Sequence, residues 1–552
     1  MANEREKQQG RKEYGKSMKK KIKGVGPFLV LGLAFLVLVF LNIFYHDHWL
    51  DSDMAAEMIF SKLLAEEGHI FATPDWYYST EFRFLYTQLI MGPLFRILDD
   101  WHLIRAITNV VTYVLMIGSY FYMMKPLQVK REWTALTGTI LLLPFSETMI
   151  THVQMGNTYM PHIIILFFFF GLYLRLVQKE DRKGKFLWNL AAFVALAVIC
   201  GVSGVRYLLA MQCPLVLTAF LYLLGSLEFG QFRSRFGSGE AGKAFRTMLK
   251  SDRARYLYYG LLGAAGGILG YGINVAWVSR QYVFQTYEAT NFIAVYQGIL
   301  WERLQNAIGS LLMLFGYIPD KGFLSLRGII SMISFVLIAV LAYCVVRVCK
   351  RSEGQRFFTA LFVVTAFVVN VFVFVFTTST MVPRYYITIL IFVLPVLAFY
   401  FEGKELLFDK WVVGALLVVC LSLSSAKITL SYLSTDKNEK ERPVAEFLSE
   451  NGYTFGYASY WHANILTELT DGAVEAANIL DPECLEYFKW SSPMKYYERG
   501  YHQGEVFLLL TAEEMDQFQD AKALDRGEKI YDDGGFAVFV YGDADRLFGE
   551  DR

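Results

Sequence analysis

Long apolar segments recur along most of the chain, and they limit what it can fold into more than any other feature. The chain has 552 residues, 55% of them hydrophobic, and a mean hydropathy of +0.34. A helix of about 20 predominantly apolar residues is long enough to cross a bilayer. Composition and segment length together predict an α-helical polytopic membrane protein rather than a soluble domain.

Hydropathy alone predicts about eleven transmembrane helices. They cover residues 25–45, 104–124, 134–151, 161–177, 187–203, 207–226, 256–278, 326–348, 357–377, 385–401 and 411–429. Alternate connections are rich in lysine and arginine, namely 125–133, 178–186, 227–255, 349–356 and 402–410. By the positive-inside rule these connections face the cytoplasm. We therefore expect a multi-pass protein of the plasma (inner) membrane, with a cytoplasmic N-terminus and an extracytoplasmic C-terminus.

The chain divides into three predicted parts. Residues 1–24 form a basic cytoplasmic tail, and residues 25–430 form the transmembrane domain. Within that domain, amphipathic stretches over 51–98 predict helices lying at the outer interface. Residues 431–552 are more polar and predict a small extracytoplasmic α/β domain. Its predicted helices are 442–450 and 461–470, and its predicted strands are 453–459, 474–479, 506–510, 529–531 and 536–541.

Acidic residues cluster directly after the first predicted span. Asp51 and Asp53 lie two residues apart, and Glu57 follows Asp53 by one helical turn. If a helix begins near Ser52, Asp53 and Glu57 share one face. One carboxylate could act as a general base on an acceptor hydroxyl, and Asp51 and Asp53 could together hold a divalent cation. The alternative is structural, because acidic residues also cap helix N-termini.

Other polar side chains are expected on the same outer side. Glu81 and Arg83 belong to the same connection as Asp53, and Glu147, His152 and His162 lie in or near the next outer connection. These five residues could line one cavity with the acidic cluster. The alternative for the second group is an ordinary solvated loop.

Two lone arginines are also predicted at the outer boundary, where the local charge rule disfavours cations. Arg206 lies in Gly-Val-Arg-Tyr, and Arg384 lies in Val-Pro-Arg-Tyr-Tyr. Guanidinium binds phosphate bidentately and stays charged, so both suit a lipid phosphate or pyrophosphate. They could instead extend to lipid headgroups or pair with a buried acid.

In the outer domain, Tyr460, Trp461 and Asn464 follow a predicted strand at the start of a predicted helix. Aromatic rings beside an amide could form a platform for stacking a sugar. The alternative is a helix start with aromatic side chains in the domain core.

Together these residues resemble the GT-C superfamily of membrane glycosyltransferases, which includes protein mannosyltransferases, oligosaccharyltransferases and lipid A aminoarabinose transferases. The specific match is the stretch from Asp51 to Glu57 after the first span, followed by interface helices. The resemblance implies a bacterial envelope enzyme that transfers sugar from a polyprenyl-phosphate donor to a glycan or lipid acceptor on the outer face. Asp53, or else Asp51, would be the base of an inverting reaction. Arg206 and Arg384 would hold the donor phosphate.

The match has departures, and other functions stay open. Where the aminoarabinose and mannosyl enzymes have an adjacent Asp-Glu pair, this chain has Asp53-Met54, and it lacks a WWD-type motif. No cofactor is required by the sequence beyond the optional cation, and nothing indicates nucleic-acid binding. The alternatives are an O-antigen-type polymerase or ligase, a transporter, and a non-catalytic envelope polysaccharide assembly protein.

Overall fold

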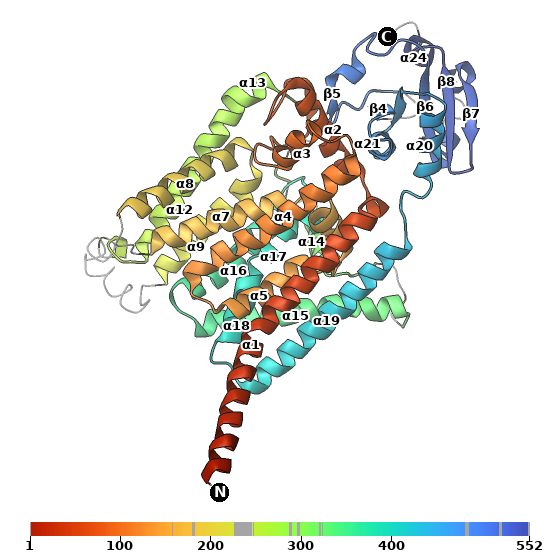
Figure 1. Cartoon of the computed structure of the whole chain (residues 1–552). Helices are drawn as coiled ribbons and strands as arrows, with labels where there is room; N and C mark the ends of the chain where they lie inside the picture. The colour runs from red at the N-terminus through yellow and green to blue at the C-terminus, as the bar shows by residue number, and fades with distance from the viewer. Residues whose placement is uncertain are drawn as a thin grey trace.

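A bundle of long helices carries a smaller α/β part at one end (Figure 1). The computed structural model describes residues 2–156, 158–178, 183–225, 246, 248–285, 290–294, 298–319, 322, 324–480, 485–517 and 522–549. The marked N-terminus lies at the far end of the bundle from the α/β part, which contains the C-terminus. The predicted connections 178–186 and 227–255 fall partly outside the described residues.

Eight helices within the described ranges are long and apolar enough to cross a membrane. They are α1 (Ala2–Tyr45, apolar from Gly24), α4 (Trp101–Met124), α7 (Met160–Val177), α8 (Lys183–Val202), α12 (Ala254–Ile273), α15 (Leu326–Arg351), α16 (Gly354–Phe376) and α19 (Leu407–Ser434). Two further helical segments, Pro383–Leu390 and Val393–Glu402, are apolar and long enough only when taken together, and they meet at a 42° bend that makes them either a broken span or a re-entrant loop. The prediction of a helical polytopic membrane protein is therefore confirmed.

The two remaining predicted spans are shorter or interrupted. Segment 134–151 breaks into α5 (Arg131–Thr139), η3 (Ile140–Leu142), α6 (Glu147–Met149) and the π-helix η4 (Ile150–Met155). The break falls at Pro144, whose ring fixes φ and whose nitrogen has no hydrogen to donate. Segment 207–226 forms the π-helix η5 (Leu208–Gln212) and α9 (Cys213–Leu224), which together make a shorter apolar helix.

Glycines let α8 and α12 approach closely. A Cβ atom built on Gly270 would lie 2.0 Å from the Val198 carbonyl oxygen, and one built on Gly201 would lie 2.0 Å from that of Gly267. No side chain fits at those distances. Small residues at such contacts allow helices to pack by van der Waals contact where lipid supplies no hydrophobic drive.

Two helices form in the first outer connection, as predicted. The helix α2 (Ser52–Glu67) begins at its N-cap Asp51 and ends at Gly68, which has φ of 76°. The shorter α3 (Gln88–Phe95) packs against α2 through a cluster that includes Met58, Leu64, Met91 and Phe95. A further helix, α14 (Leu300–Leu314), lies in the long connection between α12 and α15.

Residues 431–552, which we call the outer domain after the side of the membrane predicted for them, contain a five-stranded sheet in the order β4-β3-β6-β8-β7. Its strands are β3 (Phe455–Ser459), β4 (Glu475–Ile479), β6 (Val506–Thr511), β7 (Glu528–Asp532) and β8 (Phe536–Tyr541). β3 pairs in parallel with β4 and β6, whereas β8 is antiparallel to β6 and β7. The helices of this domain are α20 (Glu441–Glu450), α21 (Tyr460–Leu469), η9 (Met494–Tyr497), α22 (Ala512–Gln517), α23 (Lys522–Arg526) and α24 (Ala544–Phe548).

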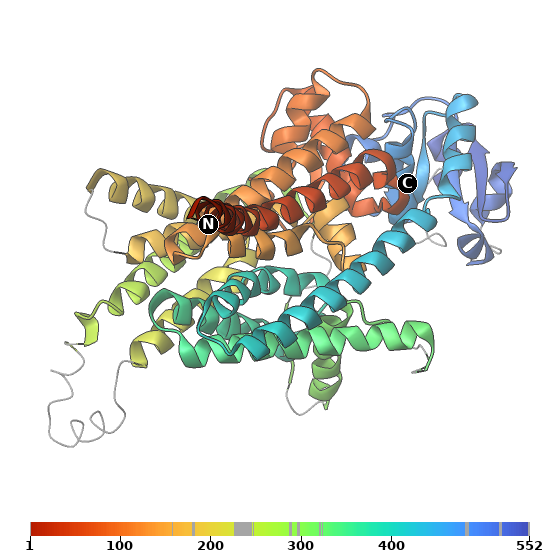
Figure 2. The ribbon, with the colours of Figure 1, turned by 60° about the horizontal axis from the view of Figure 1, so that its bottom comes forward.

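A small second sheet joins the outer domain to the membrane part. Its order is β2-β1-β5, formed by β1 (Trp76–Tyr78), β2 (Val283–Phe284) and β5 (Ser492–Pro493). β1 pairs in parallel with β2 and antiparallel with β5. Three segments far apart in the sequence are thus hydrogen-bonded side by side. Figure 2 shows the outer domain beside α2 and α3 at this end of the bundle.

Candidate active site

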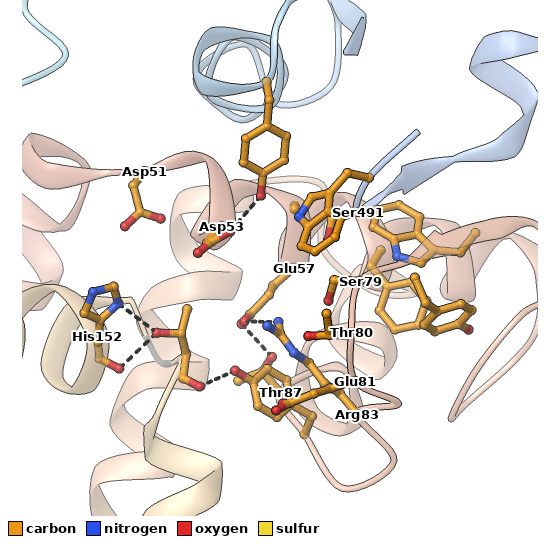
Figure 3. Close-up of a pocket in the computed structure, with 18 of the residues that line it drawn as sticks. Asp51, Asp53, Glu57, Ser79, Thr80, Glu81, Arg83, Thr87, His152 and Ser491 are labelled. Atoms are coloured by element: carbon orange, nitrogen blue, oxygen red, sulfur yellow. Dashed lines mark hydrogen bonds and ion pairs between the residues drawn. The ribbon is translucent and has the colours of Figure 1, made fainter. Parts of the chain in front are cut away.

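A cavity of about 570 Å³ lies between the outer domain and the end of the bundle that carries it (Figure 3). Its walls come from α2, from segment 76–88, from residues at the outer ends of the membrane helices, and from the first residues of α21. Most of the charged residues singled out in the sequence line it. They are Asp51, Asp53, Glu57, Glu81, Arg83, His152, His162, Arg206 and Arg384, joined by Tyr460 and Trp461.

Asp51 and Asp53 lie at the N-terminus of α2 in different surroundings. Asp51 caps the helix, and its Oδ1 accepts a hydrogen bond from the Met54 N–H (2.9 Å). Burial, reinforced by the negative charge of Asp53, raises the pKa of Asp51 to about 6. Asp53 Oδ1 instead accepts a hydrogen bond from the Tyr460 hydroxyl of the outer domain (2.7 Å; Figure 3). Both carboxylates line the cavity, but Asp51 caps the start of α2 whereas Asp53 is hydrogen-bonded to the outer domain.

Glu57 lies one turn further along the same face of α2 and is almost fully buried. Its carboxylate pairs with Arg83 (2.9 Å) and accepts a hydrogen bond from the Thr87 hydroxyl (3.1 Å). Burial raises the pKa of Glu57 to about 7, although Arg83 acts in the opposite direction. Burial thus favours the neutral form of Glu57, whereas its pairing with Arg83 favours the carboxylate.

Glu81 forms a second ion pair in the cavity, with Arg206. It accepts a hydrogen bond from Arg206 Nε, and His162 Nε2 lies 3.8 Å from its other oxygen. Burial alone would raise the pKa of Glu81, but Arg206, His162 and Arg83 outweigh it and the pKa is lowered. Arg206 also donates to the Tyr159 hydroxyl (2.7 Å). Its charge is thus largely balanced within the protein.

Arg384 differs from Arg206. It lies in the 3₁₀ turn η8 (Pro383–Tyr386) and is half-buried. Among the described residues, its guanidinium has no hydrogen bond or ion pair, although it lines the same cavity. Burial, with the positive charge of Arg384 adding to it, lowers the pKa of His152 to about 4, so His152 is neutral at pH 7. Arg384 is therefore the lining cation available to an anionic ligand.

The outer domain closes the cavity. Ser459, at the end of β3, and Tyr460 and Trp461, at the start of α21, line it together with Ile479, Leu480, Phe488, Trp490 and Ser491. Ser52 donates to the Tyr460 carbonyl oxygen and accepts from Asn464 Nδ2 (2.9 Å). Asn464 thus lies behind the wall, holding α21 against α2, rather than in the cavity.

Glu147 is also outside the cavity lining. Its side chain is 63% exposed and pairs with Lys437 (2.6 Å). The described residues contain no group of three or more His, Cys, Asp or Glu side chains placed to hold a metal. The structure therefore adds no ligand to the two aspartates that the sequence offered for a divalent cation. Any such ion would depend on Asp51 and Asp53.

Several cavity residues were missed in the sequence. Phe488 and Trp490 come from a stretch with no motif of its own, and Ser79 and Thr80 follow the short strand β1. Ser459 could have been found, because it ends a predicted strand that is followed directly by a predicted helix, and such strand ends commonly carry ligand-binding residues. A buried ion pair between Arg105 and Glu468 (2.6 Å) behind the site gave no sequence signal, since 363 residues separate the partners.

Comparison with known proteins supports the architecture. No family model and no curated protein matches the sequence. ArnT from Cupriavidus metallidurans in the apo state matches the structure with a TM-score of 0.53 and 11% identity, covering 94% of this chain and 98% of ArnT. ArnT bound to undecaprenyl phosphate matches with a TM-score of 0.52 and 12% identity over the same shares. The chain therefore has the fold of ArnT.

Proposed function

We propose that this protein is a membrane glycosyltransferase that transfers a sugar from a polyprenyl-phosphate donor to an acceptor hydroxyl on the outer face of the membrane. The observation that carries the proposal is one cavity in which Asp53 and Arg384 are both lining residues, beneath the outer domain. A carboxylate and an unpaired guanidinium are the two groups that such a transfer needs: a base and a phosphate ligand.

Arg384 is the proposed donor-phosphate ligand. Its guanidinium has no ion-pair partner among the described residues, whereas Arg206 is already bound to Glu81. ArnT, which shares the fold, has been crystallised with undecaprenyl phosphate. A fixed cation stabilises the negative charge that develops on a departing phosphate. Arg206 is then a support for the site through Glu81 and Tyr159, and it contributes positive potential rather than a direct ligand.

Asp53 is the proposed general base. It removes the proton from the acceptor hydroxyl as that oxygen forms a bond to the anomeric carbon of the donor. The bond between this carbon and the phosphate oxygen breaks, and polyprenyl phosphate leaves with the electron pair. Attack from the side opposite the phosphate inverts the anomeric configuration.

The test uses full-length protein in liposomes supplied with undecaprenyl-phosphate-linked sugars, and it measures transfer and undecaprenyl phosphate binding separately. Asp53→Asn should lower transfer by about a hundred- to ten-thousandfold, because a general base contributes that much, while binding stays unchanged. Arg384→Ala should weaken binding of undecaprenyl phosphate itself.

Matched controls come from outside the cavity. Glu147→Gln removes an exposed carboxylate, and Arg499→Ala removes an arginine that is 76% exposed, so neither should change transfer or binding. If Asp53→Asn retains full activity while Asp51→Asn loses it, the base is Asp51. If neither matters, the glycosyltransferase proposal is wrong and a non-catalytic assembly role replaces it.

A further inference from the structure

The cavity has two chemically different halves. Every charged lining residue comes from the membrane part of the chain, from Asp51 on α2 to Arg384 on η8. The outer domain contributes eight lining residues, four of them aromatic, and none of those eight carries a charge. They are Ser459, Tyr460, Trp461, Ile479, Leu480, Phe488, Trp490 and Ser491. We call these eight described residues the aromatic wall.

The rings of the aromatic wall contact one another in a continuous series. Trp461 and Tyr460 meet edge to face with centroids 5.3 Å apart, and Tyr460 meets Phe488 in the same way at 5.5 Å. Phe488 and Trp490 are stacked at 6.0 Å with an interplanar angle of 16°. Trp461 is nevertheless 66% exposed. A large exposed ring at a cavity mouth, supported by other rings, presents an apolar face that a ligand can cover.

The polar side-chain groups of the aromatic wall are hydroxyls and indole N–H groups, and none of them is an ion. The Ser459 hydroxyl is buried at the carboxyl end of the parallel strand β3 and has no hydrogen-bond partner among the described residues. The Tyr460 hydroxyl already donates to Asp53, so the wall adjoins the proposed base directly. A buried unpaired hydroxyl costs free energy unless a ligand pairs with it.

We infer that the aromatic wall binds the acceptor and that the acceptor is a neutral saccharide. This inference rests on the proposed function and specifies the acceptor of the same site. A sugar ring offers an apolar C–H face for an aromatic ring and hydroxyls for Ser459. A phosphate-bearing lipid headgroup or an acidic saccharide finds no cation on this wall, and desolvating an unpaired charge there is costly.

The geometry also orients the acceptor for reaction. A ring held against Trp461 and Tyr460 has its hydroxyls beside the Asp53 carboxylate, because the Tyr460 hydroxyl lies 2.7 Å from Asp53 Oδ1. The donor phosphate is bound across the cavity by Arg384. Acceptor and donor therefore occupy the uncharged and charged halves, respectively.

The test measures saccharide binding by full-length protein in nanodiscs. The probes are fluorescent tetrasaccharides of neutral hexoses, together with matched tetrasaccharides containing uronic acid. We expect saturable binding of a neutral probe and weaker binding of its acidic counterpart. Trp461→Ala and Trp490→Ala should each weaken neutral binding about three- to tenfold, the size expected for one aromatic contact. Trp188→Ala is the control, since Trp188 is 79% exposed on α8 and does not line the cavity.

The inference fails if no neutral probe binds, if the acidic probe binds more tightly, or if both tryptophan variants bind as well as the wild type. Undecaprenyl phosphate binding is measured in the same preparations. Arg384-dependent binding of that lipid without saccharide binding overturns the acceptor inference and leaves the glycosyltransferase proposal standing. Saccharide binding without any binding of undecaprenyl phosphate supports saccharide binding by the aromatic wall and overturns the proposal that the donor is a polyprenyl-phosphate sugar.

Discussion

Asp51 and Asp53 are two residues apart in the sequence, yet their carboxylates have different hydrogen-bond partners in the structure. Asp51 bonds to a backbone N–H of its own helix, and Asp53 bonds to a tyrosine from the outer domain. The sequence left open which of them is a cap and which is a base. The capping contact of Asp51 favours Asp53 as the proposed base, because a capping oxygen is already committed to the helix.

The pH dependence of stability should report the burial of Asp51. Its pKa is raised to about 6, so between pH 3.8 and 6 the folded protein binds more protons than the unfolded chain, and stability falls as pH rises. Asp51→Asn keeps a capping oxygen and removes the charge. We expect the variant to be more stable than the wild type at pH 7.5, by about 1–3 kcal/mol.

Thermal denaturation in detergent at several pH values measures this difference. The gap between variant and wild type should narrow as pH falls below 6. Asp100→Asn is the control, because Asp100 caps α4 through Leu103 N (2.8 Å) but is exposed. A gap that is equal at every pH would contradict the assignment of a raised pKa to Asp51.

Tyr460 is expected to position the Asp53 carboxylate. Tyr460→Phe keeps the ring and removes only the hydroxyl that donates to Asp53. A hydrogen bond to a charged group contributes about 1.5–3 kcal/mol, so transfer should fall at least tenfold. Turnover and the KM for undecaprenyl-phosphate sugar are measured together, and turnover should fall while KM stays unchanged.

Tyr531→Phe supplies the matched comparison. It removes a hydroxyl that bonds to Asp533 (2.9 Å) in the β7–β8 hairpin, away from the cavity, and should leave transfer intact. Equal losses in both tyrosine variants would mean that the hydroxyl acts on folding rather than on Asp53.

At this scale the sequence predicted much of the cavity. The alternation of positive charge placed Asp53, Arg206 and Arg384 on the same predicted side of the membrane, so these three residues could be grouped. The binding of Arg206 by Glu81 could not be foreseen, because it depends on how two connections 125 residues apart fold against each other.

Among the elements, α2 and α21 pack against each other and, beside the small sheet β2-β1-β5, hold the outer domain to the membrane part. Arg105 of α4 is fully buried, binds both carboxylate oxygens of Glu468 on α21, and donates to the Met54 carbonyl of α2 (3.0 Å). One guanidinium therefore fixes three helices around Asp53.

Breaking this ion pair should destabilise the protein strongly. Glu468→Gln leaves the Arg105 charge buried without its partner, which typically costs about 3–5 kcal/mol. Asp545→Asn breaks the exposed pair with Arg499 and should cost less than about 1 kcal/mol. Denaturation midpoints of both variants give the comparison, and similar midpoints would show that the buried pair is dispensable.

The double variant Arg105→Met with Glu468→Leu separates stability from activity. Apolar replacement of a buried pair is often neutral, so the midpoint should recover. Transfer should nevertheless be lower than in the wild type. The Met54 carbonyl no longer accepts a hydrogen bond from Arg105, and α2 is no longer held to α4 by that side chain.

Sequence patterns predicted most elements but not where helices break. All five strands of the outer sheet were predicted, because alternating apolar residues and turn residues set their ends locally. Segment 134–151 was predicted as one span because hydropathy averages over Pro144, whereas the backbone there ends one helix and begins another. The three-stranded sheet escaped prediction because strands of two or three residues leave no periodic signal.

For the whole molecule, the expected orientation is N-terminus inside and C-terminus outside. The two ends lie at opposite ends of the bundle (Figure 1). Reporter fusions after Lys23 and after Ser434 should therefore report opposite sides of the membrane. The basic tail predicts that the first is cytoplasmic. Fusions that report the same side would overturn the topology and with it the outward-facing cavity.

The small sheet β2-β1-β5 has a consequence for how the protein is made. Its strands come from residues 76–78, 283–284 and 492–493. The last strand therefore leaves the ribosome after the other two strands have been synthesised. The aromatic wall is also synthesised late, because its residues lie between Ser459 and Ser491. A nascent chain therefore carries its acidic residues and arginines long before it has a closed site. On the proposed function, it begins to use lipid-linked sugar only when synthesis is nearly finished.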